Sequence, residues 1–342
     1  MPKKYLITGG AGFIGCNYAR RLIERGEEVT IFDNLSRMGA SDNLAWIETQ
    51  MGKGTFQFIK GDIRDIESLR KVVIGQDIVA HLAAQVAVTT SVEDPKTDFE
   101  INANGTFNVL EAVRQHGRQP IVLYASTNKV YGGLDDLEII EENSRYRFRD
   151  LPRGVSESRG LDFHSPYGCS KGCGDQYMHD YARIYGIPTV VFRQSCIYGT
   201  RQFGVEDQGW VAWFIIAVNK NKKIKIYGDG KQVRDLLFID DLLDAYDAAT
   251  QQPNISQGQI FNIGGGVDYS ISIWNEFSSI LTMIHGQKIP VEQEDWRPGD
   301  QKVYISDISK VQSKLGWTPK ITVEQGIQSL YAWVKENLAL FA

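Results

Sequence analysis

A glycine-rich loop near the N-terminus places the strongest constraint on the fold of this chain. The segment TGGAGFIG, residues 8–15, follows the apolar run YLI and precedes an amphipathic run that ends near Gly26. Its glycines Gly9, Gly12 and Gly15 have the spacing G-x-x-G-x-x-G. Such glycines permit a tight turn, a close approach of the backbone to a pyrophosphate and close packing of helix on strand, while the helix N-terminus favours the anion. The loop therefore predicts a strand–turn–helix unit that binds a dinucleotide.

The first 130 residues alternate short β-rich runs with longer amphipathic runs. The short runs include VTIFD, FQFIKGD, DIVAHLAA and IVLYAS, and segments of helical periodicity such as NGTFNVLEAVRQHG separate them. This alternation is typical of repeated βαβ units, so we expect an α/β fold with a doubly wound parallel sheet of the Rossmann type. Crossovers in such a sheet bring ligands to the carboxyl ends of the strands.

Beyond Arg193 the periodicity becomes mixed and rich in aromatic residues, which predicts a second, smaller mixed α/β lobe. The run IFNIGGG is an exception, because it predicts one more strand of the first sheet. We therefore expect one domain of residues 1–194 plus about 235–264, and a second of about 195–234 plus 265–342. The charge-rich stretch 133–165 interrupts the alternation, and it is either a solvated insertion or a lid over an anionic substrate.

Composition and charge narrow the classes of protein to which the chain can belong. With 342 residues, 42% of them hydrophobic, it can bury a large core. Its formal net charge of -5 leaves no overall basic field for nucleic acid or an anionic membrane. No segment approaches the roughly 20 apolar residues that a membrane helix needs, and the four cysteines are too scattered for a disulfide framework. We expect a cytoplasmic protein without nucleic-acid or membrane partners.

An acidic residue at the end of the second β-rich run bears on the identity of the dinucleotide. Asp33 closes the run VTIFD. A carboxylate at this position accepts hydrogen bonds from the adenosine ribose and repels a 2′-phosphate, which favours NAD over NADP. Arg37 lies close enough in sequence to leave NADP open.

A tyrosine and a lysine four residues apart form the candidate catalytic pair. Tyr167 and Lys171, in SPYGCSKG, share one face of a predicted helix. A phenol with a pKa of about 10 is a poor base at neutral pH. Lys171 and a positively charged nicotinamide would favour its phenolate, so that Tyr167 serves as general base and acid. Thr127 follows the strand IVLYAS, where its hydroxyl is placed to bind the same substrate oxygen.

The glycine loop, the strand-end hydroxyl and SPYGCSK, in this order, resemble the extended short-chain dehydrogenase/reductase family of NAD-dependent epimerases and dehydratases over essentially the whole chain. The resemblance implies that Lys171 hydrogen-bonds the nicotinamide ribose, that Thr127 positions a sugar hydroxyl, and that Tyr167 removes its proton as hydride passes to NAD. Asp62 resembles the family position that binds the adenine amino group, and HLAA, residues 81–84, resembles the strand segment beside the cofactor. The cofactor-binding residues implied in this way are Gly9, Gly12, Phe13, Ile14, Gly15, Asp33, Asn34, Ser36, Arg37, Asp62, Ile63, Leu82, Ala83, Ala84, Gln85, Asn102, Ala125, Ser126, Tyr167, Lys171, Ser195 and Cys196.

The two residues that follow Thr127 bear on the class of reaction. In the dehydratase branch of the family, an Asp-Glu pair follows this threonine and eliminates water by acid–base chemistry. Asn128 and Lys129 stand here instead, and an amide and an ammonium cannot supply two carboxyl groups. What remains is oxidation with return of the hydride, which is epimerisation, or a net dehydrogenation.

Four longer segments resemble one branch of the family more closely than the others. AAQVAVTTSVEDPKTDFEINANGT, DFHSPYGCSKG, FRQSCIYGTRQFG and EDQGWVAWF are more similar to the CDP-paratose 2-epimerases, also called CDP-tyvelose epimerases, than to UDP-glucose 4-epimerases, which usually carry R-Y-F-N where Arg193, Gln194, Ser195 and Cys196 stand here. The resemblance implies that C2 of CDP-paratose is oxidised to a 2-keto sugar, which turns over and accepts hydride on its other face to give CDP-tyvelose. A UDP-hexose 4-epimerase or another nucleotide-sugar epimerase is the close alternative. A non-catalytic NAD-sensing binding protein is a distant one.

Two arginines are candidates for binding the substrate pyrophosphate. Arg234 and Arg297 resemble family residues with this role, which suits a guanidinium because it donates two hydrogen bonds to neighbouring oxygens. We expect nearby carboxylates to orient them rather than to bind a metal, namely Asp235, Asp240 and Asp300. The substrate-binding residues implied by the resemblance are Gln85, Thr127, Asn128, Ser195, Arg201, Arg234 and Arg297. It also implies that the second domain binds the nucleotide sugar, that the protein is a homo-oligomer (dimer or tetramer), and that its product enters lipopolysaccharide O-antigen biosynthesis.

Overall fold

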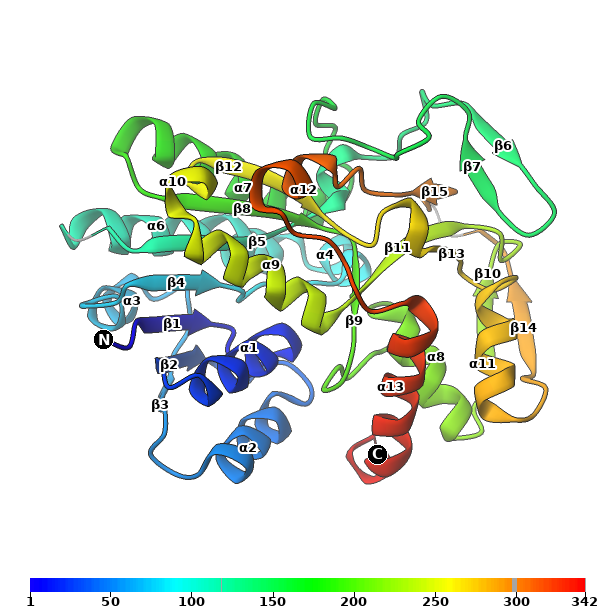
Figure 1. The fold of residues 1–342 in the computed structure, drawn as a ribbon, viewed down its shortest axis with the longest axis horizontal. Helices are drawn as coiled ribbons and strands as arrows, with labels where there is room; N and C mark the ends of the chain where they lie inside the picture. The colour runs from blue at the N-terminus through cyan, green and yellow to red at the C-terminus, as the bar shows by residue number, and fades with distance from the viewer. Residues whose placement is uncertain (118, 297–299, 342) are drawn as a thin grey trace. The chain divides into compact units, whose positions relative to one another are not determined.

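The structure is a computed structural model that describes residues 1–117, 119–296 and 300–341 (Figure 1). The chain divides into two compact units. The first comprises residues 1–130, 165–193 and 245–261, and the second comprises residues 131–164, 194–244 and 262–342. Residues 131–164 and 235–244 thus belong to the second unit, whereas the sequence assigned them to the cofactor-binding domain. The reason is pairing: Val155 bridges Ser306, and the strand around residue 235 pairs with three strands of the second unit.

The first unit is built on a seven-stranded sheet with the order β12-β8-β5-β4-β1-β2-β3 (Figure 1). Its strands are β1 (Lys4–Thr8), β2 (Glu28–Asp33), β3 (Gln57–Lys60), β4 (Ile78–His81), β5 (Ile121–Thr127), β8 (Thr189–Gln194) and β12 (Gln259–Ile263). β1 pairs in parallel with both β2 and β4, β2 with β3, and β4 with β5. Because the chain moves outward from β1 to β3 and then returns to β4 on the other side, the sheet is doubly wound. The α/β fold class expected from the sequence is confirmed.

Helices cover both faces of this sheet. They are α1 (Phe13–Glu24), α2 (Ala40–Met51), α3 (Ile66–Val72), α4 (Val88–Glu93), α5 (Pro95–Phe99), the π-helical turn η1 (Glu100–Asn104), α6 (Gly105–Gln115), α7 (Ser165–Tyr185), α10 (Pro253–Ser256) and the part of α9 (Ile239–Gln251) from residue 245 on. Alternate strand residues face opposite sides: Leu6 packs into a core with α3, α6 and α7, whereas its neighbour Tyr5 contacts Tyr18 of α1. Tyr18 in turn contacts Tyr246 of α9, which packs on Phe192 of β8. Two faces buried in this way explain why the strands read as nearly continuous apolar runs.

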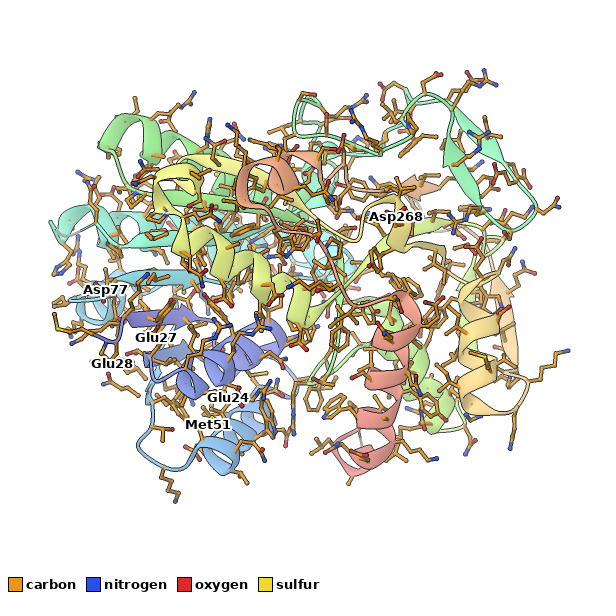
Figure 2. All side chains as sticks on the ribbon, viewed as in Figure 1. Glu24, Glu27, Glu28, Met51, Asp77 and Asp268 are labelled. Carbon is orange, nitrogen blue, oxygen red and sulfur yellow. The ribbon has the colours of Figure 1, made fainter. Side chains whose placement is uncertain are left out.

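Acidic side chains gather where β2 and β4 begin, at the amino-terminal edge of the sheet (Figure 2). Glu28 forms an ion pair of 3.4 Å with Lys4, and Asp77 accepts a hydrogen bond of 2.9 Å from the backbone amide of Lys4. Glu27 accepts a hydrogen bond of 2.5 Å from the backbone amide of Lys3. These contacts fix the N-terminal residues to the edge of the sheet that lies opposite the carboxyl ends of the strands.

The second unit contains small sheets and several helices (Figure 1). Its elements are the η2 turn (Asn128–Tyr131) from residue 131 on, β6 (Ile139–Glu141), β7 (Tyr146–Phe148), β9 (Cys196–Tyr198), α8 (Trp210–Asn219), β10 (Ile224–Tyr227), β11 (Val233–Phe238), η3 (Val267–Tyr269), β13 (Ser270–Ser272), α11 (Phe277–His285), β14 (Val291–Glu294), β15 (Val303–Tyr304), α12 (Ser309–Leu315), α13 (Val323–Glu336) and η4 (Leu338–Leu340). β11 is the centre of the larger sheet, because it pairs with β9, β13 and β15. Trp210 is half-buried and packs edge-on against Phe214 and Phe277. No helix in the described part of the chain is long and apolar enough to cross a membrane.

Two ion pairs, Arg145 with Glu276 and Arg153 with Asp307, connect the charge-rich stretch 133–165 to the rest of the second unit. Its strands β6 and β7 form an antiparallel hairpin whose residues Tyr146 and Phe148 are buried. Arg145 donates to Glu276 at 2.8 and 2.6 Å. The other arginines of the stretch also pair with carboxylates: Arg147 with Glu142, Arg149 with Glu138, Arg153 with Asp307, and Arg159 with Asp136. The stretch therefore has a few buried anchors, such as Tyr146 and Phe148, while many of its charged side chains are exposed to solvent.

Candidate active site

Five parallel strands of the first unit end at the same edge of the sheet, and most of the predicted site residues lie there. The last residues of β1, β2, β4 and β5 are Thr8, Asp33, His81 and Thr127. β3 ends at Lys60, and Asp62 follows it. Because carboxyl ends of parallel strands share one edge, positions scattered over 120 residues of sequence become neighbours in space.

The glycine loop forms the tight turn that the sequence predicts. Gly9 has a φ of +70°, and a Cβ atom there would lie 2.6 Å from the backbone nitrogen of Ala83. A Cβ atom on Gly15 would lie 2.3 Å from the carbonyl oxygen of Gly9. Both distances are too short for any side chain, so the turn requires glycine. Gly12 caps α1 without a side-chain hydrogen bond, and Phe13, Ile14 and Gly15 form its first turn, which carries no acidic residue. The amino end of α1 therefore suits an anion.

Asp33 is a buried carboxylate that the backbone holds in place. It is 9% exposed, and its two oxygens accept hydrogen bonds from the backbone amides of Ala11, at 3.0 Å, and Leu35, at 2.7 Å. Burial raises the pKa of Asp33, while these two amides act in the opposite direction. Each oxygen has a lone pair left, so Asp33 is an oriented acceptor at the end of β2.

The residues that follow β2 and β3 are linked by hydrogen bonds. Asp62 accepts from Asn34 at 2.9 Å and from the guanidinium of Arg64 at 3.0 and 2.7 Å. The contact with Arg64 holds the pKa of Asp62 at about 2. Ser36 donates its backbone amide to Asn34, and both Ser36 and Arg37 are exposed. Asp62 is thus an ionised acceptor, and the Asn34 side chain links it to the loop after Asp33.

His81 is a packed, neutral histidine whose tautomer follows from its partners. Thr106 donates its hydroxyl proton to the carbonyl of Asn102 at 2.6 Å, so it accepts from Nε2 of His81 at 3.0 Å. Nδ1 of His81 is then an acceptor, and the hydroxyl of Thr8 donates to it at 2.8 Å. Burial and the charge of Lys171 lower the pKa of His81 to about 3. This chain of bonds joins the ends of β1 and β4.

Asn102 fixes the loop that follows β4. Its side chain accepts from the backbone amide of Gln85 at 2.9 Å and donates to the Gln85 carbonyl at 3.1 Å. It lies in the π-helical turn η1, an irregularity that often occurs at functional sites because it turns one side chain out of helical register. The predicted residues Leu82, Ala83 and Ala84 lie in the same loop, and Ile63 packs in the core beside it.

The side chain of Thr127 lies close enough to Tyr167 to lower the pKa of its phenol. Thr127 closes β5, where its hydroxyl oxygen accepts the backbone amide of Lys129 at 3.2 Å and its hydroxyl donates to the side-chain oxygen of Asn128 at 3.3 Å. Tyr167 lies in the first turn of α7, where its backbone amide donates to Ser91 at 3.1 Å. Burial raises the pKa of Tyr167 to about 12, while the neighbouring Thr127 side chain acts in the opposite direction. Burial outweighs this effect, so Tyr167 needs a further positive charge to become a base.

Lys171 lies one turn after Tyr167 on α7 and is 3% exposed. Its ammonium is 4.2 Å from the centre of the Tyr124 ring. Burial lowers the pKa of Lys171 to about 7, while the charges of Asp175 and Asp98 raise it. The face of the Tyr124 ring and the two carboxylates therefore stabilise the charged form of Lys171, which burial disfavours.

Sequence reasoning missed both of these carboxylates. Asp98 accepts from Ser170 at 2.5 Å and from Asn102 at 3.0 Å. Asp175 accepts from Ser126 at 2.7 Å and twice from Arg193. Asp175 follows Lys171 by four residues, and this helical spacing was a signal that could have revealed it. Asp98 had no such signal, because it lies 72 residues before Ser170.

The positions after β5 carry no carboxyl group. Asn128 and Lys129 begin the η2 turn, and the Asn128 side-chain oxygen lies 3.3 Å from the Thr127 hydroxyl. Ala125 and Ser126 precede them within β5, and the hydroxyl of Ser126 donates a hydrogen bond to Asp175. The acid–base pair that eliminates water in a dehydratase therefore has no counterpart at residues 128 and 129.

Ser195 and Asp235 form a buried pair in the second unit. Ser195 donates its hydroxyl to Asp235, and its backbone amide donates to Ile263 at 2.9 Å. Asp235 also accepts the backbone amides of Gly266 and Ser306, each at 3.2 Å. Burial raises the pKa of Asp235, and these donors act against it. Asp235 therefore holds the strand ends together. The sequence analysis expected it to orient Arg234, and in this respect the expectation was wrong.

Arg234 and Arg201 are the predicted substrate-binding arginines that the structure describes. Arg234, on β11, donates to Asp300 at 2.9 Å, so this carboxylate does orient the guanidinium. Arg201 has a φ of +69°, and its guanidinium stacks over the Trp333 ring at 5.5 Å. Cys196 is the first residue of β9, and Arg297 lies outside the described residues.

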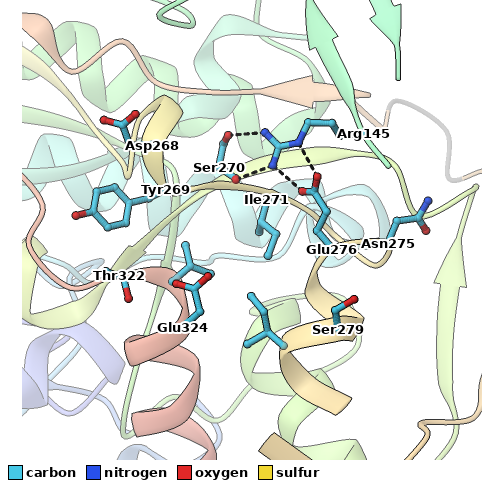
Figure 3. A pocket seen from close by; sticks show the side chains of 12 residues that line it. Arg145, Asp268, Tyr269, Ser270, Ile271, Asn275, Glu276, Ser279, Thr322 and Glu324 are labelled. Carbon is cyan, nitrogen blue, oxygen red and sulfur yellow. Dashed lines mark hydrogen bonds and ion pairs between the residues drawn. The ribbon is translucent and has the colours of Figure 1, made fainter. Parts of the chain in front are cut away.

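A cavity of about 660 Å³ lies in the second unit, between η3, α11 and the start of α13 (Figure 3). The ion pair of Arg145 with Glu276 lines it, together with Asp268 and Glu324. Arg145 also donates to Ser270, so its guanidinium is largely committed to the protein. Within the described ranges no three His, Cys, Asp or Glu side chains form a group that could hold a metal ion.

Comparison with known proteins shows similarity along the whole chain. The sequence model of a family described as GDP-mannose 4,6 dehydratase matches residues 6–330. The CDP-paratose 2-epimerase of Salmonella typhi is 45% identical over 341 residues, which covers 96% of this chain and 98% of that protein. A putative UDP-glucose 4-epimerase of Methanocaldococcus jannaschii is 35% identical, with 97% of this chain and 98% of that protein covered.

A solved structure has the same fold. It is the crystal structure of UDP-glucuronic acid 4-epimerase from Bacillus cereus in complex with UDP-glucuronic acid and NAD. It superposes with a TM-score of 0.83 at 30% identity and covers 97% of this chain and 99% of that chain.

Proposed function

Because this chain belongs to the GDP-mannose 4,6 dehydratase family, we propose that it is an NAD-dependent nucleotide-sugar epimerase that converts CDP-paratose into CDP-tyvelose. The resemblance to extended short-chain dehydrogenases/reductases seen in the sequence is thereby confirmed at family level. The family contains both epimerases and dehydratases, so the reaction has to be argued from the site.

One observation carries the choice of epimerisation. Thr127 lies beside Tyr167, which shares helix α7 with Lys171, but neither residue 128 nor residue 129 carries a carboxyl group. The site therefore has the groups to move the proton of a sugar hydroxyl and lacks the pair that would eliminate water. The choice of CDP-paratose rests on the 45% identity to the Salmonella typhi enzyme, against 35% to the putative UDP-glucose 4-epimerase.

The residues at the carboxyl edge of the first sheet fit NAD. The turn at Gly9 and Gly15 brings the uncapped amino end of α1 to this edge, where a pyrophosphate would accept its amide protons. Asp33 offers its remaining lone pairs to the hydroxyls of an adenosine ribose. Bound there, NAD would take a hydride from C2 of the sugar and return it to the opposite face of the resulting carbonyl.

The chain's own side chains handle the proton. Tyr167 takes the proton of the sugar hydroxyl and gives it back after inversion, and Thr127 holds the same oxygen through its hydroxyl. The buried Lys171 ammonium supplies positive charge that favours the phenolate. Because burial raises the pKa of Tyr167 to about 12, this charge is needed for function near neutral pH.

Inversion also requires that the sugar turn while its nucleotide stays bound. We assign this anchoring to the second unit, where Arg234, held by Asp300, offers a guanidinium to the pyrophosphate. Arg201, Ser195 and Asn128 complete the proposed substrate contacts. A cytoplasmic location, assembly into a dimer or tetramer, and a role in O-antigen synthesis are parts of the proposal that rest on resemblance alone.

To test the proposal, the purified protein is incubated separately with CDP-paratose and with UDP-glucose, without added reductant. NMR of the sugar ring protons monitors the reaction. Inversion of CDP-paratose at C2 is the expected result. CDP-paratose carrying deuterium at C2 should keep its label at C2 in the product, because the hydride returns to the carbon that lost it. Loss of the deuterium to water would show instead that the C2 hydrogen leaves as a proton, which would contradict the proposed oxidation by NAD.

A UDP-hexose 4-epimerase is the second candidate, and the 35% identity to the putative UDP-glucose 4-epimerase favours it. Conversion of UDP-glucose to its C4 epimer, with CDP-paratose unchanged, would move the chemistry to C4. Turnover of neither substrate would remove both candidates while leaving the family assignment intact.

A further inference from the structure

The buried charge of Lys171 needs a counter-charge, and two buried carboxylates act on it electrostatically. Asp98 is 1% exposed and Asp175 is 0% exposed. Both act on Lys171 electrostatically, and Asp175 has the larger pairwise effect. Taking an ammonium out of water is costly unless negative charge compensates it, so the role of each carboxylate depends on what else it neutralises.

The charge of Asp175 is already balanced. Arg193, 3% exposed, donates to both of its oxygens at 2.9 and 2.8 Å, and Ser126 donates at 2.7 Å. A bidentate guanidinium is the strongest partner a carboxylate has in proteins. The field of Asp175 at Lys171 is therefore largely cancelled by the cation beside it.

Asp98 differs, because the donors it receives are neutral. Ser170 donates to one oxygen at 2.5 Å and Asn102 to the other at 3.0 Å. These bonds orient the carboxylate but do not neutralise it. Two carboxylates, one guanidinium and one ammonium sum to zero charge, and this balance assigns Asp98 to Lys171.

The other groups facing Lys171 carry no charge that could replace Asp98. His81 on β4 is neutral, because burial and Lys171 lower its pKa to about 3. Burial raises the pKa of Tyr124 on β5 well above its ordinary value, raises that of Tyr167 on α7 to about 12, and raises that of the Cys173 thiol. Near neutral pH all four side chains are uncharged.

Asp98 is also connected to Tyr167 and Lys171 through Ser170, which lies between them on α7. Ser170 immediately precedes Lys171, and its hydroxyl lies 3.2 Å from the carbonyl of Tyr167 while it donates to Asp98. The turn that carries Tyr167 and Lys171 is thereby tied to α5. Asn102 connects the same carboxylate to the loop at Gln85.

We propose that Asp98 is a positioning residue of the active site, which keeps Lys171 protonated and holds the turn of α7 that presents Tyr167. The inference rests on the proposed function for its catalytic meaning. Its electrostatic part concerns Lys171 alone and is measurable without a substrate.

The Asp98→Asn variant removes the charge and fits the site. The introduced amide keeps its oxygen on Asn102 and donates to the Ser170 hydroxyl, which then turns its proton to the Tyr167 carbonyl at 3.2 Å. Without the negative charge, Lys171 should release its proton at a pH lower by about one unit or more. Asp94→Asn is the matched control, since Asp94 is an exposed carboxylate at the start of the same helix and accepts the backbone amide of Thr97.

The experiment uses the full-length protein with its bound cofactor, labelled with ¹³C and ¹⁵N in the lysine side chains. Comparison with Lys171→Met assigns the Lys171 signal, which is then titrated in wild type, Asp98→Asn, Asp94→Asn and Asp98→Glu. We expect a downward shift of about one pH unit or more in Asp98→Asn only, with Asp98→Glu near the wild-type value. If Asp98→Asn fails to fold, Asp98→Ser provides a second neutral side chain.

The pH profile of turnover is the second measurement. The alkaline limb of kcat should move to lower pH in Asp98→Asn by the same amount as the Lys171 titration. Identical Lys171 titration in wild type and Asp98→Asn would overturn the inference, as would a uniform loss of activity with an unmoved limb, which a merely structural role produces. Absence of turnover on both sugar nucleotides would instead reject the proposed function, and the titration alone would then decide the role of Asp98.

Discussion

Arg193 donates two hydrogen bonds to Asp175, at 2.9 and 2.8 Å, and both side chains are almost completely buried. The pair joins β8 to α7 one turn beyond Lys171. Its importance to the site is indirect, since it neutralises one of the two carboxylates near the catalytic lysine.

Removing one member of this pair should destabilise the protein. Arg193→Met leaves the Asp175 charge buried without its cation, and we expect a loss of about 3–5 kcal/mol in the free energy of unfolding. Arg183→Met is the control, because Arg183 pairs with Asp180 on the same helix but is 62% exposed. That change should cost less than about 1 kcal/mol. Denaturant unfolding of both variants measures the difference, and equal losses would show that the buried pair has no special weight.

Tyr167→Phe should abolish epimerisation while the cofactor stays bound. The phenol oxygen is the proposed proton acceptor, and its loss should lower turnover by at least about 100-fold. Tyr177→Phe, an exposed tyrosine on the same helix, should keep wild-type turnover. Turnover and NAD content of the two purified variants form the test, and an active Tyr167→Phe enzyme would move the proton transfer to another group.

Asp33→Asn should weaken the preference for NAD. The amide keeps one acceptor oxygen but loses the charge that repels a 2′-phosphate, so affinity for NAD should fall about tenfold and affinity for NADP should rise. Asp42→Asn, an exposed position on α2, should change neither. Calorimetric titration of the cofactor-free variants with both dinucleotides gives the two constants, and an unchanged ratio would remove Asp33 from the ribose site.

His81 should make the protein sensitive to acid. Its pKa falls from about 6.5 in the unfolded chain to about 3 in the folded protein, because burial disfavours the imidazolium. Between these values the unfolded state binds a proton that the folded state does not, so stability is fully present above pH 6.5 and declines as the pH falls toward 3. The loss is at most about 5 kcal/mol, since each pKa unit corresponds to about 1.4 kcal/mol. The free energies of unfolding of wild type and His81→Gln should therefore approach each other as the pH falls from 6.5 toward 3. The same pH dependence in both proteins would contradict the burial of a neutral imidazole.

Arg234→Ala should raise KM for the sugar nucleotide by about tenfold or more if Arg234 makes the proposed bidentate contact to the pyrophosphate. Arg153→Ala is the control in the same unit, because Arg153 is 77% exposed and lies 3.6 Å from its carboxylate partner. Steady-state kinetics with CDP-paratose compare the two. An unchanged KM in Arg234→Ala would show that Arg234 does not bind the substrate and that its role is the ion pair with Asp300.

Local spacing in the sequence was enough to predict the fold class and the placement of Tyr167 and Lys171 on one helix. The loop at Gly9 and Gly15 is predictable because only glycine fits a turn where a Cβ atom would collide with the backbone. Tyr167 and Lys171 are predictable as a pair because four residues make one helical turn. Alternating β-rich and amphipathic runs likewise predict parallel strands whose carboxyl ends meet.

The partners of these residues were decided by tertiary structure. Ser170 meets Asp98 from 72 residues away, and Ser126 meets Asp175 from 49 residues away. Such contacts depend on which strands become neighbours and leave no periodic signal in the sequence. The same holds for Asp235, which receives Ser195 and two backbone amides and does not orient Arg234, because alternate residues of a strand face opposite sides.

The sequence by itself therefore determined the doubly wound sheet, the glycine turn and the spacing of Tyr167 and Lys171, since each follows from the geometry of a few consecutive residues. Only the tertiary structure decided how the charges of the site are balanced. Asp175 lies one helical turn after the buried ammonium of Lys171, but its partner Arg193 and the second carboxylate, Asp98, come from other segments, so the charge balance depends on packing and not on a local pattern.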